Sequence, residues 1–229
     1  MELRRIVSDA FHFFVGNIKQ IAVLCLPFLL AVAVFNNVVL DPFQAAEESG
    51  NVFLISWFVK LMVHPIYMAA LILLMARRAE NQNPRNSELL SGALQRYTTL
   101  LVLNIIVMAL ISSGIMLMIL PGLWAAVRLW FAKYFLVLEG SHPREAIIKS
   151  YRATAKHFWL ILSLMALFGL PILILVVSIV NLFSLVGENR TLLVVADTAI
   201  PFLMLFIDVV LFRVFMGVVR EAPELRPAA

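Results

Sequence analysis

The chain has 229 residues, of which 62% are apolar and 14% charged, whereas roughly 25% of the residues in an ordinary soluble domain are charged. The 18 basic and 14 acidic residues are too few and too clustered to form the polar shell of a water-soluble globule. They lie between apolar runs long enough to cross about 30 Å of hydrocarbon, which takes about 20 helical residues. The composition therefore predicts an all-α, polytopic membrane protein with a single integral membrane domain over residues 1–229.

The rare residue types exclude several other classes of function. The single cysteine, Cys25, lies in an apolar run, so no disulfide framework exists. The four histidines lack the spacing that places metal ligands on one helix face: His12, His64, His142 and His157. No GxSxG, HExxH or paired-aspartate motif occurs. We therefore expect no enzyme activity, no metal and no cofactor. The formal charge of +4 reflects basic residues at membrane borders, so we expect no nucleic-acid partner.

The first half of the chain predicts three spans and two in-plane helices. Residues 1–20 place Ile6 and Ala10 at helical spacing with most charges elsewhere around the helix, which is typical of a helix lying in the interface. A second amphipathic helix is expected to begin at Asn86 or Ser87. The apolar runs that meet the length requirement are residues 21–40, 52–76 and 98–120.

The second half predicts three more spans and a third in-plane helix. Pro121-Gly122 interrupts an apolar run and predicts a tight hairpin. A helix that begins near Pro143 has a moderately apolar face. The three spans are residues 123–138, 159–180 and 191–218. The predicted fold thus has six transmembrane helices, with cytoplasmic interfacial helices before spans 1, 3 and 5.

Basic residues predict the orientation of these spans. Arg190 alone falls in the connections on one side, and thirteen Lys and Arg fall on the other. The thirteen are Arg4, Arg5, Lys19, Arg77, Arg78, Arg85, Arg96, Arg144, Lys149, Arg152, Lys156, Arg220 and Arg226. By the positive-inside rule, both termini lie in the cytoplasm.

The three predicted interfacial helices also share a pattern. Each places a small polar or charged pair before an alanine and then passes from an amphipathic helix into a span; the alanines are Ala10, Ala93 and Ala146. The pattern is either an internal repeat, which is common in membrane folds, or the usual appearance of a cytoplasmic lead into a span.

The segment from Pro121 to Leu164 has a composite pattern: a Pro-Gly, an arginine, an acidic residue with glycine, an Ala-rich basic helix with a serine, and an aromatic entry to the next span. These positions are Pro121, Gly122, Arg128, Glu139, Gly140, Ala146, Ser150 and Trp159. In this pattern the chain resembles the YciC family of bacterial inner-membrane proteins, and a related pattern occurs in the membrane domain of some glycerophosphodiester phosphodiesterases. The resemblance implies a multi-pass protein of the bacterial inner membrane and carries over no catalytic residues.

Charges inside the predicted spans are the candidates for a functional site, because each is costly in hydrocarbon unless it is paired or hydrated. They form a candidate intramembrane polar cluster: Lys60, Arg128, Asp197 and Asp208. One interpretation is a hydrated path or a headgroup-binding cavity. The other is structural pairing of Lys60 or Arg128 with Asp197. In that case Lys133 and Arg213 extend to the cytoplasmic border, and Arg128 is a structural clamp.

The sequence supports two functional hypotheses. The first is a non-enzymatic inner-membrane protein of envelope or lipid homeostasis, with membrane lipids and other inner-membrane proteins as partners. Its candidate headgroup contacts are Lys149, Arg152 and Lys156, unless these three only fix the topology. The second is a small transporter or flippase-like carrier, with a polar path through spans 2, 4 and 6 lined by the four intramembrane charges.

Overall fold

The structure is a computed structural model that describes residues 3–40, 49–186 and 190–221. Within these ranges the regular elements are all helices. Five of them are long and apolar enough to cross a membrane: Ile18–Val39, Val52–Ala79, Tyr97–Leu117, Phe158–Ile179 and Arg190–Glu221. The chain is therefore an all-helical membrane protein.

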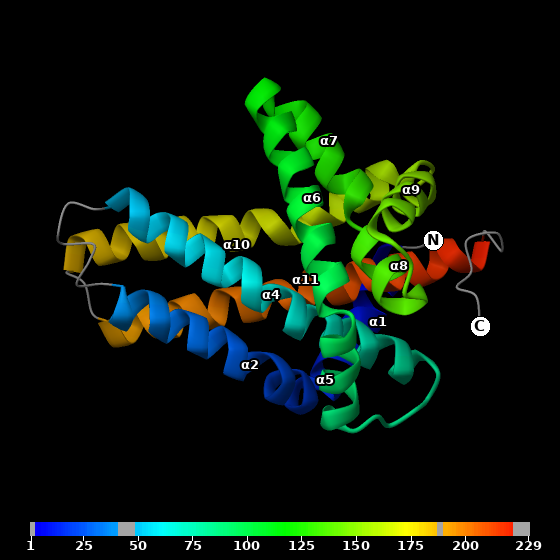
Figure 1. Ribbon diagram of the computed structural model, residues 1–229, viewed down its shortest axis with the longest axis horizontal. Coiled ribbons are helices and arrows are strands. Elements are labelled where there is room, and N and C mark those ends of the chain that lie inside the picture. The colour runs from blue at the N-terminus through cyan, green and yellow to red at the C-terminus, as the bar shows by residue number, and fades with distance from the viewer. Residues whose placement is uncertain (1–2, 41–48, 187–189, 222–229) are drawn as a thin grey trace.

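Four long helical segments run along a common direction (Figure 1). They are α2 (Ile18–Val34), continued by the π-helical segment η1 (Phe35–Val39), then α4 (Ser49–Ala79), α10 (Phe158–Val186) and α11 (Arg190–Glu221). The α11 helix packs against α2 and α10, and α2 packs against α4. All residues from 207 to 212 of α11 are buried, so α11 is the central helix of this bundle.

Short helices precede three of the long ones, at the positions where the sequence predicts amphipathic helices. They are α1 (Leu3–Gly16), α5 (Asn86–Gln95) and α9 (Pro143–Thr154). A break in the helix separates each from the long helix that follows. The three aligned alanines, Ala10, Ala93 and Ala146, are all 0% exposed. A small side chain at this position lets each short helix pack closely against the helices beside it.

The helices α6 (Tyr97–Leu117) and α7 (Ile119–Leu129) form the expected hairpin, with the turn at Met118 instead of Pro121. Pro121 lies in the first turn of α7, where its missing N–H leaves no helical hydrogen bond unmade. Two glycines allow the helices to touch, because a Cβ on Gly114 would lie 2.8 Å from the Gly122 Cα.

This hairpin runs across the direction of the four long segments, and its tip projects away from them (Figure 1). The side chains at the tip are apolar and strongly exposed; Met116 is 89% and Leu117 79% exposed. The α6 helix is apolar around its whole circumference, which is typical of a helix surrounded by protein or by lipid. Since little of α6 is covered by protein, its surface suits lipid.

The predicted fourth span, residues 123–138, is not a single helix, which corrects the sequence-based interpretation. The α7 helix ends at Leu129, and α8 (Ala132–Glu139) begins after a turn. The turn frees the Arg128 carbonyl, which accepts hydrogen bonds from Ser150 Oγ at 2.7 Å and from Thr154 Oγ1 at 3.3 Å. With 11 and 8 residues, α7 and α8 are each too short to cross a bilayer.

Aromatic packing explains why α8 lies in the core. The rings of Phe135 and Phe215 are 4.9 Å apart, and those of Tyr134 and Phe215 are 5.3 Å apart. Each such pair adds about 0.5–1.5 kcal/mol beyond the burial of its surface. The Tyr134 hydroxyl also donates to the Asp208 carbonyl at 3.0 Å. These contacts hold α8 against the middle of α11, beside the candidate site.

Candidate functional site

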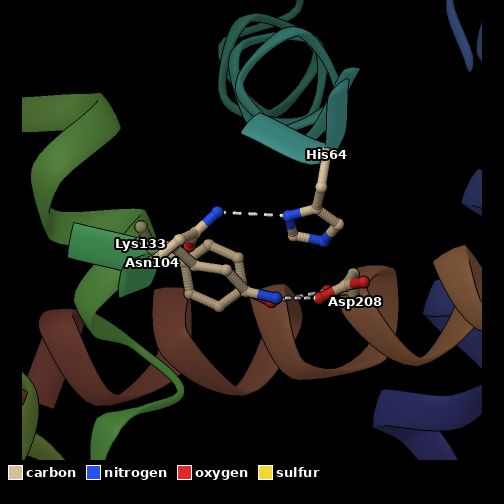
Figure 2. A network of polar contacts seen from close by, with 5 residues as sticks. His64, Asn104, Lys133 and Asp208 are labelled. Carbon is tan, nitrogen blue, oxygen red and sulfur yellow. Dashed lines mark hydrogen bonds and ion pairs between the residues drawn. The ribbon is translucent and has the colours of Figure 1, made fainter. Parts of the chain in front are cut away.

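A buried ion pair joins α8 to α11. Asp208 is 8% exposed, and its carboxylate pairs with Lys133 (Figure 2). The Lys133 ammonium also lies over the Trp130 ring, 4.4 Å from its centroid. Lys133 therefore points into the protein, and the expectation that it extends to a membrane border is wrong. Lys133 is the second residue of α8, and the turn between α7 and α8 changes the direction of the chain just before it.

A histidine and an amide extend this pair into a network (Figure 2). The Asn104 side-chain amide donates to His64 Nδ1 at 3.2 Å, which assigns the proton of a neutral imidazole to Nε2. Figure 2 shows the His64 ring extending from α4 toward the side of α11 that carries Asp208. The network thus draws polar groups from α4, α6, α8 and α11. The sequence identified His64 only as an isolated histidine and did not identify Asn104.

A pocket of about 240 Å³, lined in part by His64, lies between α2, α4 and α11. We call it the Lys60 pocket; its lining is Leu29, Val32, Ala33, Asn36, Lys60, Val63, His64, Tyr67, Asp197 and Pro201. Two of the four predicted charges, Lys60 and Asp197, meet here. No ion pair joins them in the part of the chain that the structure describes. Lys60 and Asp197 are both exposed.

The π-helical segment η1 contributes the polar wall of this pocket. Asn36 is 8% exposed, and neither its amide nitrogen nor its amide oxygen has a hydrogen-bond partner. The next residue, Asn37, donates to Asp197 Oδ2 at 2.7 Å and so holds that carboxylate in place. Single π-helical turns within α-helices often occur at functional sites. The pocket therefore contains unmet hydrogen-bonding capacity, which the sequence did not reveal because it depends on the local helix type.

Arg128 lies apart from these groups. Its guanidinium donates to the Tyr151 carbonyl at 3.1 Å and lies 4.7 Å from the Tyr151 ring centroid and 5.4 Å from that of Trp124. It also lies 5.9 Å from the centroid of the Phe158 ring, so its partners are on α7, α9 and α10, and Asp197 is not among them. The four predicted charges occupy three places: Lys60 and Asp197 share a pocket, Asp208 pairs with Lys133, and Arg128 joins α7 to α9.

The three candidate headgroup contacts on and after α9 differ in their surroundings. Lys149 pairs with Glu139, the acidic residue at the end of α8. Arg152 and Lys156 are exposed. Lys149 therefore has a structural partner, and the other two are open to a charged surface.

A second cavity, of about 450 Å³, lies between α1, α4 and α11. We call it the arginine cavity. Its polar lining is Arg5, Asp9, Arg213 and Arg220, and its apolar lining includes Ile6, Phe13, Met75, Val209, Phe212 and Met216. Among the described residues, none of the three arginines forms an ion pair. The cavity therefore combines an excess of positive charge with apolar walls, which suits an anionic amphiphile.

The sequence analysis did not identify the arginine cavity, although a signal was present. Arg213, Gly217 and Arg220 recur at intervals of four and three residues and so share one face of α11. Arg5 and Asp9 share a face of α1 in the same way. What the sequence did not provide was the packing of α1 against α11, where Phe14 meets Phe206 at 5.6 Å between ring centroids.

No family model, curated protein or solved structure matches the chain. Within the described ranges, no three His, Cys, Asp or Glu side chains lie together as metal ligands. The fold and its buried charges define the class, a helical integral membrane protein.

Proposed function

We propose that the chain is a non-enzymatic protein of the bacterial inner membrane that binds anionic lipid and serves envelope or lipid homeostasis. The arginine cavity carries this proposal. Guanidinium groups pair with phosphate through charge-assisted, often bidentate, hydrogen bonds. Arg5, Arg213 and Arg220 outnumber the one acidic group of the cavity, Asp9. The apolar walls would receive the first part of an acyl chain.

The predicted orientation supports this assignment. The positive-inside rule places α1 and the end of α11 at the cytoplasmic face, where anionic headgroups attract basic residues. Arg152 and Lys156, exposed near the end of α9, each add about 1 kcal/mol of attraction to such a surface. The resemblance to the YciC family supports a bacterial inner membrane.

We propose a topology in which α2, α4, α10 and α11 cross the bilayer and both termini are cytoplasmic. The α6–α7 hairpin then enters the lipid from the cytoplasmic side and returns to it. This arrangement accounts for the direction of the hairpin (Figure 1) and for its exposed apolar tip. Four crossings, like the six that the sequence predicts, place both termini on the same side of the membrane.

Lipid retention tests the proposal. The Arg213→Gln/Arg220→Gln variant and a matched control at two exposed basic residues, Lys19→Gln/Arg85→Gln, lose the same charge at different places. After purification in mild detergent, we expect the cavity variant to retain about tenfold less phosphatidylglycerol, the equivalent of about 1.4 kcal/mol. The control should retain nearly the parental amount. Equal retention by the parent and the cavity variant would exclude the cavity as the lipid site.

A second candidate, a small carrier, is favoured by one observation: Lys60 and Asp197 line the same pocket. Uptake of a solute into vesicles that contain the purified chain, and its loss in Asp197→Asn, would support this candidate. Unchanged uptake in Asp197→Asn would remove the pocket from any transport path.

A further inference from the structure

We infer that the Lys60 pocket binds a small zwitterion, a group that carries a primary ammonium and a phosphate or carboxylate a few bonds apart. The inference does not depend on the anionic-lipid role of the arginine cavity. It names a ligand class for the pocket on which the carrier candidate rests, and it holds whether or not the ligand is transported.

The first reason to expect a zwitterion is that two opposite charges line the pocket. Lys60 lies on α4 and Asp197 on α11, and they are not paired with each other. Lys60 is eight residues from Val52, the start of its candidate span, which places it about 12 Å along the helix. Unpaired charges at such a depth are costly. A ligand with both signs would neutralise both at once, whereas a simple anion or cation would leave one unpaired.

The second reason is the side-chain amide of Asn36, which has a donor and an acceptor to offer a ligand. A buried amide that makes no hydrogen bond destabilises a protein, and here the unmet donor and the unmet acceptor both belong to a side chain that lines the pocket. The donor suits an anionic oxygen of the ligand, and the acceptor suits an ammonium. Asn37 already fixes the Asp197 carboxylate, so the group that would bind the ammonium is held in place before the ligand arrives.

The volume of the pocket limits the size of the ligand. At about 240 Å³, the pocket is smaller than the sites of about 300–1,000 Å³ that bind drug-sized ligands. This volume is enough for an ethanolamine phosphate group and too little for a whole lipid. The ligand is therefore either a soluble zwitterion or the headgroup of a lipid whose acyl chains stay outside the pocket.

Binding measurements on the purified full chain distinguish these sources. The soluble probe is glycerophosphoethanolamine, titrated in detergent by calorimetry, with glycerophosphoglycerol and ethanolamine as probes that carry one charge only. The lipid probe is phosphatidylethanolamine in nanodiscs, detected by native mass spectrometry. Binding of either zwitterionic probe supports the inference and identifies its source. Binding of neither, or equal binding of the single-charge probes, overturns it.

Variants test the assignment of the residues. We expect Lys60→Gln and Asp197→Asn each to weaken binding at least tenfold, while Lys156→Gln has no effect. Asn36→Leu should raise the unfolding temperature of the empty protein, because it removes two buried unpaired atoms, and should nevertheless abolish binding. Parental affinity in Asn36→Leu would overturn the inference. Arg213→Gln/Arg220→Gln should bind the zwitterion normally, which separates this test from that of the anionic-lipid proposal.

Discussion

At Asp208, one carboxylate on the central helix meets one ammonium of α8 in the interior of the protein. The side chains of Lys133 and Asp208 are 16% and 11% exposed, so removing either one leaves the other charge buried and unpaired. We expect Lys133→Met or Asp208→Leu alone to lower the free energy of unfolding by about 3 kcal/mol. Chemical denaturation in detergent measures this loss.

The double variant Lys133→Met/Asp208→Leu is the control for this prediction. Because it removes both charges together, it should lose clearly less stability than the two single losses added together. Strict additivity of the two losses would show that the pair is not coupled.

Arg128 connects α7 to α9 through a charged hydrogen bond to the Tyr151 carbonyl and a contact with the Tyr151 ring. We expect Arg128→Leu to lower the stability of the fold by about 2 kcal/mol. Arg128→Lys should restore only part of it, because an ammonium cannot stack as a guanidinium does. The midpoint of thermal unfolding and the folded yield in detergent measure both. If Arg128→Leu unfolds at the parental temperature, Arg128 is not a clamp.

At the residue scale, the sequence identifies which side chains are unusual but not what they contact. Lys60, Asp197 and Asp208 stand out because they are charged and lie within apolar runs. Their partners depend on the rotation of each helix and on the break before α8, and neither is encoded in a local pattern. The sequence does not identify Asn36 either, because its position in the pocket depends on the π-helical segment η1.

At the element scale, the contact between α6 and α7 depends on glycine. A Cβ at position 122 would lie 2.7 Å from the backbone nitrogen of Ile115, which cannot move without shifting α6. We expect Gly122→Ala to lower the stability of the fold by about 1–3 kcal/mol. Gly169→Ala is the matched control, because it is also helical and its Cβ would meet nothing within 4 Å. Equal unfolding midpoints for the two variants would contradict the close contact.

The tip of the same hairpin tests where α6 lies. In a Cys25→Ala background, a spin label attached to Met118→Cys in vesicles should be more accessible to dissolved oxygen than to a water-soluble nickel chelate. We expect this because the tip is apolar and suits hydrocarbon. Preferential access of the nickel chelate added outside the vesicle would contradict a tip held within the lipid.

The sequence predicts most elements and fails at one. Apolar length locates the long helices, and amphipathic spacing locates α1, α5 and α9. Residues 123–138 are apolar enough to resemble a span, but the run combines an exposed part of a hairpin with a buried core helix. Composition cannot separate these two environments, because hydrocarbon and protein interior select similar side chains.

At the scale of the whole molecule, α11 connects the three polar regions. Asp197 lines the Lys60 pocket, Asp208 joins the buried network, and Arg220 lines the arginine cavity. The 23 residues from Asp197 to Arg220 span about 35 Å of helix, close to the thickness of a bilayer. The class of protein follows from composition alone. The order of these sites along one helix follows only from how α1, α2, α4 and α8 pack against it.

Photo-crosslinking tests the central claim, that the arginine cavity holds an anionic lipid. A photoactivatable amino acid in place of Met216, a residue of the cavity wall, would be irradiated in vesicles that mix phosphatidylglycerol with phosphatidylethanolamine. The same amino acid in place of the exposed Trp159 is the control. We predict that the adducts at position 216 are enriched in phosphatidylglycerol several-fold over the vesicle composition, and that Arg213→Gln/Arg220→Gln removes this enrichment. Adducts at both positions that match the vesicle composition would contradict the claim.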